Sequence, residues 1–470
     1  MQHNSFARKC QSRLITFLSG VAALVMFATS MQAIAADGPG AAEKDKPQQA
    51  GAPAPEGAQT VKAVSQVALP EPLTLESLMT LPDTVNPQVL MSQAKQAQAQ
   101  ADYHLEEASD AVQLDVMGRL GWREYANENQ DNHLLALHVG KQLYDFGKTE
   151  SAKEAKLYLS QAQSDLYKDQ VSQFQLSLMQ GFFNVILADL QYRVDNEDMA
   201  VVYVSLDKAK DRHELKRISD VEYLKLQSDY EKILVKRTRS AYEQRRTREA
   251  LANLVGQPQN LPDKLKFPGL KQIAKRDLKP LATYQQAALA NNLQLQALKS
   301  KLEAAKSQME SQSADDKPVI RADAWAGKLS SYEYLREGRW RFDLTMDVPL
   351  YDGGIQSAKM SRSRAELLQA QADVKAMEQS LRDQVADIYF KLQLTQAEKK
   401  QNSVFGNYAD LYLDYSRALY ENEATTDLGD AMVRLSEATL QTVSTQFKQA
   451  LYWAKLDYLT GQSVKLDAYQ

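Results

Sequence analysis

The sequence lacks the features on which several common protein classes depend. Among 470 residues there is a single cysteine, Cys10. It lies in a predicted secretory signal peptide, residues 1–35, in which a basic start precedes the apolar stretch 14–27 and Ala33-Ile34-Ala35 forms the expected cleavage site. We therefore expect a mature chain without disulfides, thiol catalysis or cysteine-ligated metal, and without a lipid on a mature N-terminal cysteine.

Long apolar runs and catalytic motifs are also missing. After the signal peptide there is no apolar run of about 18 residues, the length of a transmembrane helix. No phosphate-binding loop, dinucleotide fingerprint or nucleophile–histidine–acid set is visible. His133 and His138 are five positions apart in an expected strand, hence on opposite faces, and do not form a metal site. We predict no enzyme activity, no cofactor, no metal and no nucleic-acid partner; the basic run at Arg245 and Arg246 reads as a solvated helix face.

What the chain does contain is a repeat of half its length. Leu143-Tyr144-Asp145-Phe146-Gly147 returns as Leu350-Tyr351-Asp352-Gly353-Gly354, and the Leu-x-x-Leu-x-Gly pattern ending at Gly256 returns at Gly461. Residues 36–72 are rich in Ala, Pro, Gly and Gln, which predicts a disordered leader. We place the first repeat at 73–260, a connector at 261–280 and the second repeat at 281–470.

Most of each repeat is predicted to be helical. Residues 147–208 and 354–415 contain almost no helix breaker, which indicates two very long helices with coiled-coil-like packing. Leu381, Val385, Ile388 and Leu392 recur at the three- and four-residue spacing of a buried stripe. Segments 86–110 and 220–256 together match the length of the first long helix, and 281–313 with 427–461 match the second. We therefore expect two short helices stacked end to end beside each long one.

Four segments show the alternation of β-strands: 111–125, 133–144, 319–334 and 339–351. In the last of these, Trp340, Phe342 and Leu344 face away from the charged residues between them. One interpretation is an amphipathic sheet covered on its apolar side in a soluble protein. Strand length and aromatic residues near the strand ends favour the other, a membrane barrel. Because four strands cannot close a barrel and lipid does not tolerate open edges, this second interpretation requires oligomerisation.

These features together resemble the TolC-type outer-membrane efflux protein family from about residue 73 onward. Pro349 to Gly354 is similar to that family's junction between strand and long helix, with a looser first copy at 142–147. The resemblance implies a mainly α protein with a β-barrel part. Duplicated helical hairpins would form a periplasmic α-barrel, and four strands per chain would contribute to a twelve-stranded barrel in a homotrimer.

The resemblance also implies a function. The chain would be the outer-membrane exit duct of a tripartite efflux pump or a type I secretion system in a Gram-negative bacterium. Its partners would be outer-membrane lipid, a periplasmic adaptor protein and an inner-membrane transporter, and most of the chain would lie in the periplasm. The alternative is a periplasmic coiled-coil adaptor or scaffold without a pore.

The turns of the two helical hairpins, near 213–220 and 421–430, are the candidate adaptor contacts. The residues concerned are Arg217, Ser219, Asp220, Glu423 and Thr426. Ser219 with Glu222 also fits a capping box, and Thr426 an N-cap. Helix capping or a charge in the first helical turn is the alternative role for Asp220.

Asp427 and Asp430 share one helix face because they are three positions apart. By resemblance they match the paired acids at the periplasmic aperture of TolC-type channels, where three copies would form two carboxylate rings. An ordinary solvated acidic pair is the alternative. Glu423 stands where TolC has a gate-latching arginine, so that lock is not expected here.

Charged residues of the strands are the candidate lining of the barrel. The alternation predicts a mixed-charge wet wall in which these residues also pair with one another. They are Arg119, Arg123, Arg321, Asp323, Arg341, Asp343 and Asp347.

Overall fold

The computed structural model describes residues 69–125, 128–131, 133–258, 260–270, 273, 276–330, 337–422 and 428–462. The chain divides into two compact units. The described part of the β unit lies within Asp110–Asp145 and Pro318–Val348, and that of the helical unit within Val61–Ser109, Phe146–Lys317 and Pro349–Gln470. Signal peptide and most of the leader lie outside the described residues. Leu69, near the end of the expected leader, packs against the core of the helical unit.

The β unit contains an antiparallel sheet to which both repeats contribute two strands. Its order is β1 (Gln113–Arg119), β4 (Leu134–Tyr144), β5 (Val319–Ser330) and β6 (Glu337–Asp347). The first expected strand, 111–125, is interrupted at Leu120 and Gly121. The short strands β2 (Trp122–Tyr125) and β3 (Glu128–Asp131) form a separate two-stranded sheet. β6 ends at Asp347, shortly before Pro349, which has no backbone N–H for a ladder hydrogen bond.

The helical unit is built on two helices of 67 residues each, α4 (Lys148–Glu214) and α9 (Ile355–Glu421). At 1.5 Å per residue each is about 100 Å long. The first repeat adds α2 (Leu75–Met79), the short η2 (Asp83–Val85), α3 (Pro87–Ser109) and α5 (Asp220–Leu254). The second repeat adds α7 (Leu281–Asn291), α8 (Leu293–Ser313) and α10 (Leu428–Leu459).

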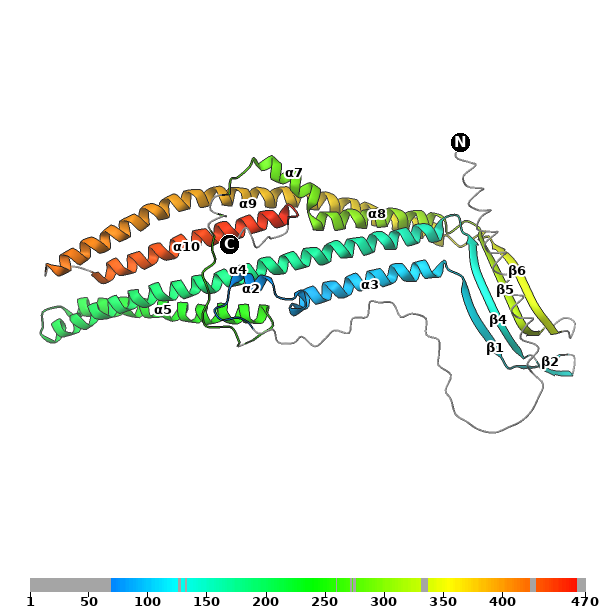
Figure 1. Cartoon of the computed structure of the whole chain (residues 1–470), viewed down its shortest axis with the longest axis horizontal. Coiled ribbons are helices and arrows are strands. Elements are labelled where there is room, and N and C mark those ends of the chain that lie inside the picture. Colours follow the sequence, from blue (N-terminus) through cyan, green and yellow to red (C-terminus); the bar gives the residue numbers. More distant parts are fainter. Residues whose placement is uncertain are drawn as a thin grey trace, which may run out of the picture. The chain divides into compact units, whose positions relative to one another are not determined.

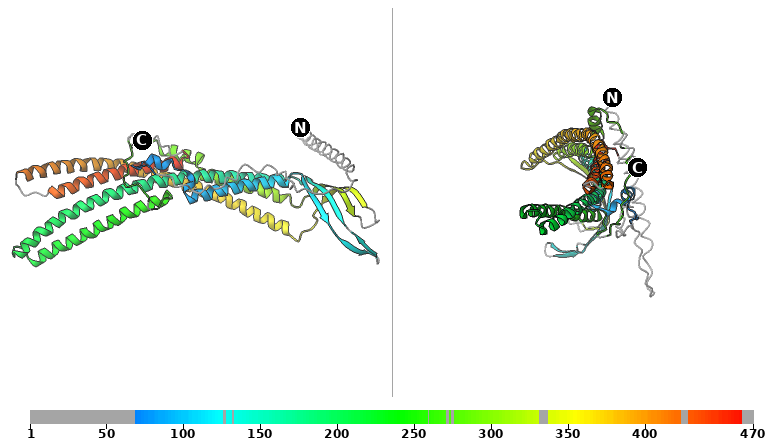
Figure 2. Two further views of the ribbon diagram at one scale, coloured as in Figure 1. Left: turned by 60° about the horizontal axis from the view of Figure 1, so that its bottom comes forward. Right: turned by 90° about the vertical axis from the view of Figure 1, so that its left-hand side faces the viewer.

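Short helices stack along the long ones as their lengths predict. Both α3 and α5 pack against α4, while α7, α8 and α10 all pack against α9 (Figure 1). Neighbouring helices contact each other in the order α3, α4, α8, α9 in one half of the unit. In the other half the order is α5, α4, α10, α9. Seen along its length, this layer of helices is curved (Figure 2). α4 and α9 therefore hold the two halves of the layer together.

One expected helix, 281–313, is in fact two. Asn292 takes an extended ψ of 125° and ends α7. Its side-chain Oδ1 accepts from the Leu295 backbone N at 3.0 Å and so caps α8, while Nδ2 donates to the Leu459 carbonyl at 3.2 Å. The side chain at the break therefore both caps α8 and hydrogen-bonds to the end of α10.

The core lies where the two repeats meet. Its largest fully buried side chains include Trp453, Phe182, Phe183 and Phe447. Phe183 on α4 stacks on Phe447 on α10 with ring centroids 4.2 Å apart. Large aromatic side chains bury much apolar area, so this stack contributes to the packing of the two repeats against each other.

The repeated Leu-x-x-Leu-x-Gly motif closes the last helix of each repeat. Gly256 and Gly461 have φ values of 69° and 72°, in the left-handed region that favours glycine. The residue after each glycine donates back along the helix, Gln257 N to Ala252 O and Gln462 N to Asp457 O. This is the hydrogen-bond pattern of a Schellman cap, which explains why the pattern occurs at both half-ends.

Candidate functional site

The charged residues of the four-stranded sheet lie on one face. Asp115 is opposite His138, His138 is opposite Trp325, and Trp325 is opposite Arg341. Directly opposed residues in an antiparallel pair point to the same side, as do residues two apart in one strand. The predicted lining residues that share this face are Arg119, Arg321, Asp323, Arg341, Asp343 and Asp347. Arg123 does not join them, because it lies on β2 in the separate sheet.

Several of these groups are in contact across the strands. Arg341 pairs with Asp343 and lies over the Trp325 ring, 4.7 Å from its centroid. His138 has a carboxylate on each ring nitrogen: Asp115 at 2.9 Å and Asp323 at 3.0 Å. The sequence predicted pairing on this wall but not the place of His138, whose only sequence signal is its position on the charged face.

The opposite face of the sheet is apolar and exposed. Trp340 is 76% exposed, and Val116 and Leu344 are 70% and 64% exposed. Other exposed apolar residues on this face are Leu114, Leu135, Phe342 and Met346. A contiguous apolar face of this kind marks a surface that is covered in the functional protein.

The turn between α4 and α5 is organised by local contacts. Ser219 caps α5 by accepting the Glu222 backbone N–H at 3.2 Å. Asp220 is not a lone first-turn charge, since its Oδ1 lies 2.7 Å from His213 Nε2 at the end of α4. The His213 ring also stacks on Tyr223, with centroids 4.7 Å apart. Arg217 follows Lys216, whose φ is 57°, and its backbone N–H donates to Arg212 O.

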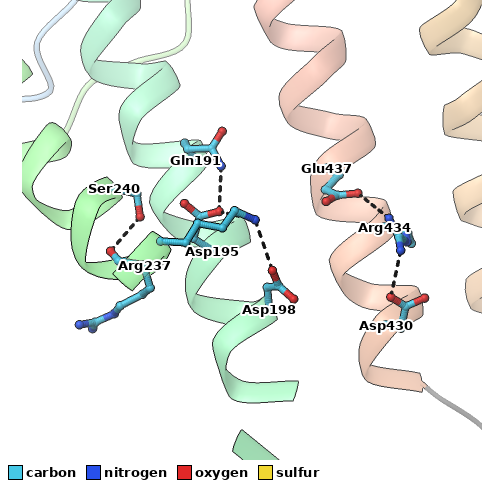
Figure 3. A network of polar contacts seen from close by, with 9 residues as sticks. Gln191, Asp195, Asp198, Arg237, Ser240, Asp430, Arg434 and Glu437 are labelled. Atoms are coloured by element: carbon cyan, nitrogen blue, oxygen red, sulfur yellow. Dashed lines mark hydrogen bonds and ion pairs between the residues drawn. The ribbon is translucent and has the colours of Figure 1, made fainter. Parts of the chain in front are cut away.

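At the second turn the structure describes Asp430 but not Glu423, Thr426 or Asp427, which lie outside the described residues. Asp430 is in the first turn of α10, 3.5 Å from Arg434 one turn later, and Arg434 also meets Glu437 at 3.2 Å (Figure 3). The negative charge of Asp430 is the main reason that the pKa of Arg434 is raised. Sequence reasoning missed Arg434, although its i+4 spacing from Asp430 is a signal for such a pair.

Hairpin α4–α5 is cross-linked close to this point. Lys236 on α5 lies 3.1 Å from the buried carboxylate of Asp195 and 3.3 Å from Asp198, both on α4. Gln191 donates a further hydrogen bond to Asp195 (Figure 3). Burial disfavours the charge of Lys236, but the two aspartates outweigh this effect and raise its pKa. These contacts link the two helices of the hairpin at this level.

A second polar cluster is buried where α4, α8 and α10 meet. Asp169 Oδ2 accepts from Gln173 at 2.9 Å and from Gln294 at 2.8 Å, and both amides also reach the Tyr458 hydroxyl. Asp169 Oδ1 is buried and has no hydrogen-bond partner among the described residues. Burial raises the pKa of the Asp169 carboxyl despite these hydrogen bonds.

The helical unit also carries a groove of about 600 Å³ lined by α4, α5, α9 and α10. Most of the lining is uncharged and polar, including Asn184, Gln191, Gln401, Gln441 and Ser444. The charged residues in it are Glu243, Glu398 and Lys448. Such a lining is suited to water and hydrogen-bonding solutes rather than to an apolar ligand.

Within the described ranges no group of three or more His, Cys, Asp and Glu side chains is arranged to hold a metal ion. Of the helices in those ranges, none combines the length and apolarity needed to cross a membrane.

Comparison with known proteins identifies a family that the second repeat matches. Residues 284–462, nearly all of the second repeat, match the outer membrane efflux protein family. The second repeat is thus similar in sequence to this family. The resemblance drawn from the repeated motifs is thereby confirmed. No curated protein matches the sequence.

Solved structures extend the likeness in fold to both repeats of the chain. The outer membrane protein VceC of Vibrio cholerae aligns with a TM-score of 0.68 at 15% identity, over 83% of this chain and 97% of that one. The CmeC outer membrane channel of Campylobacter jejuni aligns with a TM-score of 0.68 at 11% identity, over 84% of this chain and 86% of that one. The MtrE outer membrane channel of Neisseria gonorrhoeae aligns with a TM-score of 0.65 at 17% identity, over 84% of this chain and 91% of that one. These likenesses confirm the predicted fold class, a helical barrel fold with a β portion.

Proposed function

We propose that the chain forms, as a homotrimer, the outer-membrane exit duct of an efflux pump. The observation that carries this proposal is the four-stranded sheet, which has an exposed apolar face and ends in β1 and β6. Lipid does not tolerate open strand edges, so these outer strands need partners from other copies. Three copies of four strands give the twelve-stranded barrel that the resemblance implies.

Helix α9, at one edge of the helical layer, supports the same assembly. Its buried residues Leu381, Val385 and Leu392 follow the three- and four-residue spacing of a coiled-coil seam and face the layer. A second apolar stripe with the same spacing is offset by two positions, or about 200° around the helix. Its members are all more than half exposed: Phe390, Leu394, Val404, Tyr408, Leu411 and Tyr415. α9 is thus built to have a helix on each side.

Helix α5, at the other edge, also has an unpartnered apolar stripe. Val221, Val235 and Tyr242 lie at heptad spacing and are 78%, 57% and 65% exposed. Pairing of α5 in one copy with α9 in the next would be a heterologous contact that closes a ring when the rotation fits. The curved layer of Figure 2 is consistent with such closure.

The remaining parts of the proposal concern partners. The chain itself carries out no catalysis; a periplasmic adaptor and an inner-membrane transporter would deliver substrate to it. The adaptor would dock on the hairpin turns that include Arg217, Ser219, Asp220, Glu423 and Thr426. The clamp formed by His213 on Asp220 supports this role for the first turn, because a preorganised surface loses less entropy on binding.

Asp427 and Asp430 are proposed to line the periplasmic aperture. Three copies would place two carboxylate rings there, a filter that favours cations and can be blocked by divalent ions. Arg434 partly offsets the negative charge of Asp430 by pairing with it. Changing both aspartates to alanine should abolish block by a divalent cation in single-channel recordings; unchanged block would disprove the assignment.

Fractionation and bilayer recording test the function itself. We expect a trimer in outer membranes that runs faster on gels before heating, and stable conductance after reconstitution into planar bilayers. A soluble periplasmic monomer would contradict the proposal and favour the adaptor or scaffold alternative.

The interface is tested on α9. Leu411→Glu places a charge in the exposed stripe and should convert the trimer to monomer, because an unpaired charge would be buried between helices. Ser403→Glu, at an exposed position about 80–100° around the helix from Leu411 and Val404, is the matched control and should leave the trimer intact. Equal trimer yields from the two variants would refute this interface.

A further inference from the structure

Three side chains from three strands form a chain of contacts across the polar face of the sheet. Asp115 on β1 lies 2.9 Å from His138 Nδ1, and Asp323 on β5 lies 3.0 Å from His138 Nε2. His138 on β4 is between them. The side chains of His138 and Asp323 are only 18% and 16% exposed, whereas that of Asp115 is 52% exposed. We call these three residues the charge clip.

The clip requires two shared protons. A neutral imidazole has one N–H and can donate to only one carboxylate; its other nitrogen would then face a second carboxylate, lone pair against lone pair. Both contacts are hydrogen bonds only when a second proton is present, on the imidazole or on one carboxyl group. In either case the clip carries a net charge of one negative unit, and without that proton it carries two. The proton belongs to the three groups together, as in other coupled titrations.

The surroundings are shaped for this arrangement. A methyl group at Gly140 would lie 2.9 Å from Asp323 Oδ1 and 3.2 Å from His138 Cε1, so only glycine leaves room for the two side chains to meet. The His138 ring stacks on Trp325 at 4.8 Å. Trp325 in turn has the Arg341 guanidinium 4.7 Å from its ring centroid. Stacking on Trp325 orients the His138 ring, and the missing side chain at Gly140 leaves the room that the ring and Asp323 need.

The other charged groups on this face come from β1, β5 and β6. Arg119 on β1 and Arg321 on β5 lie on the same side as the clip, and so do Arg339, Arg341, Asp343 and Asp347 on β6. Arg341 and Asp343 pair with each other. The guanidinium groups keep their charge throughout the accessible pH range, whereas histidine is the side chain whose ordinary pKa lies near neutrality, and His138 is the histidine on this face.

We propose that Asp115, His138 and Asp323 form a proton-carrying clip that sets the ion selectivity of the strand-lined part of the duct. This inference rests on the proposed function, because it takes the polar face of the sheet to line the pore. Each copy would add one negative charge to the pore wall when the clip loses its second proton. A ring of such charges attracts cations and repels anions, so cation preference rises with pH.

The test is the cation-to-anion permeability ratio of the reconstituted full-length trimer, measured from reversal potentials in a potassium chloride gradient at about pH 6 and about pH 9. For the wild type we expect the ratio to rise by about twofold or more between the two values. His138→Gln cannot hold the second proton. It should show the high ratio already at the lower pH and match the wild type at the higher one.

One control and one further variant complete the design. His133→Gln changes the other histidine of the same hairpin, which contacts Trp122 rather than the clip, and should follow the wild-type profile. Asp115→Asn removes one carboxylate from the exposed end of the clip and should lower the ratio at the higher pH. It serves in place of His138→Gln if that variant does not assemble.

The outcomes separate the two proposals. If the wild type forms no pores, the proposed function fails. If it forms pores whose permeability ratio is the same at both pH values, or if His138→Gln reproduces the wild-type profile, the duct assignment stands and the charge clip is wrong.

Discussion

The ion pair between Arg276 and Asp457 offers the most direct test of how the two repeats are held together. Arg276 lies in the connector after the first repeat, and Asp457 lies in the last turn of α10, 181 positions later. The guanidinium donates two hydrogen bonds, of 2.7 and 2.6 Å, to the two carboxylate oxygens. It also lies 4.1 Å from the centre of the Trp453 ring. One residue thus ties the connector to the core.

Arg276→Ala should be strongly destabilising because it leaves a charge behind. The side chain of Asp457 is 8% exposed, so its carboxylate would lose its partner without gaining full hydration. Removing one member of a buried pair costs about 3–5 kcal/mol. The arginine side chain is 32% exposed, and water can replace part of its contribution. We therefore expect the free energy of unfolding to fall by about 2–3 kcal/mol.

The measurement is urea unfolding followed by helical circular dichroism, in detergent and at fixed protein concentration because the assembly contributes to stability. Arg276→Lys keeps the charge but loses the two-pronged geometry and should cost about 1 kcal/mol. Asp457→Asn completes a double-mutant cycle, in which we expect a coupling energy of about 2 kcal/mol.

Arg246→Ala is the matched control. Arg246 also pairs with an acid, Glu243, but that pair is exposed on one helix, so no resolvable change is expected. If Arg276→Ala were as stable as this control, the reasoning from burial would be refuted.

Three further predictions concern charge. Burial opposes ionisation of Asp315, but its two lysine partners outweigh burial and lower its pKa. The stabilisation that the ionised carboxylate provides is present above the ordinary carboxyl pKa and is lost as pH falls through the lowered pKa. Asp315→Asn should therefore be less stable than wild type at neutral pH and equal to it in strong acid, as pH-dependent melting would reveal. Burial raises the pKa of Asp169, so the contribution of this residue to folding stability is most favourable below the ordinary carboxyl pKa and declines as pH rises through the raised pKa. Asp169→Asn should remove this decline. The same dependence of melting temperature on pH in the two proteins would contradict this prediction. Arg434→Ala should strengthen divalent-cation block in single-channel recordings, because Asp430 would lose its counter-charge; a weaker block would show that Asp430 does not face the ion path.

Much of the architecture could be predicted from local patterns. The scarcity of glycine and the absence of proline over long stretches predicted α4 and α9, and strand alternation predicted which residues of β6 share a face. The boundaries were less predictable where a single side chain competes with the pattern. Asn292 divides one expected helix because its amide bonds to Leu459, a partner 167 positions away that no local rule can identify.

The candidate site divides in the same way. Membership of the charged wall follows from alternation, so most of the predicted lining residues share one face. Arg123 does not, because the break at Leu120 and Gly121 moves it to a second sheet. Arg434 could have been found from its spacing to Asp430. The pairing of His138 with Asp323 could not, because it depends on the hydrogen-bonded register of β4 and β5.

By itself, the sequence determined the duplicated plan, the helix and strand types, and the apolar stripes that leave α5 and α9 in need of neighbours. These are properties of spacing within a segment, and spacing is fully contained in the chain. Tertiary structure alone decided which charges meet: Asp323 with His138, Arg276 with Asp457, Lys236 with Asp195. Each pair joins different elements, and electrostatic contacts act only within a few ångströms, so their existence depends on packing that no single segment encodes.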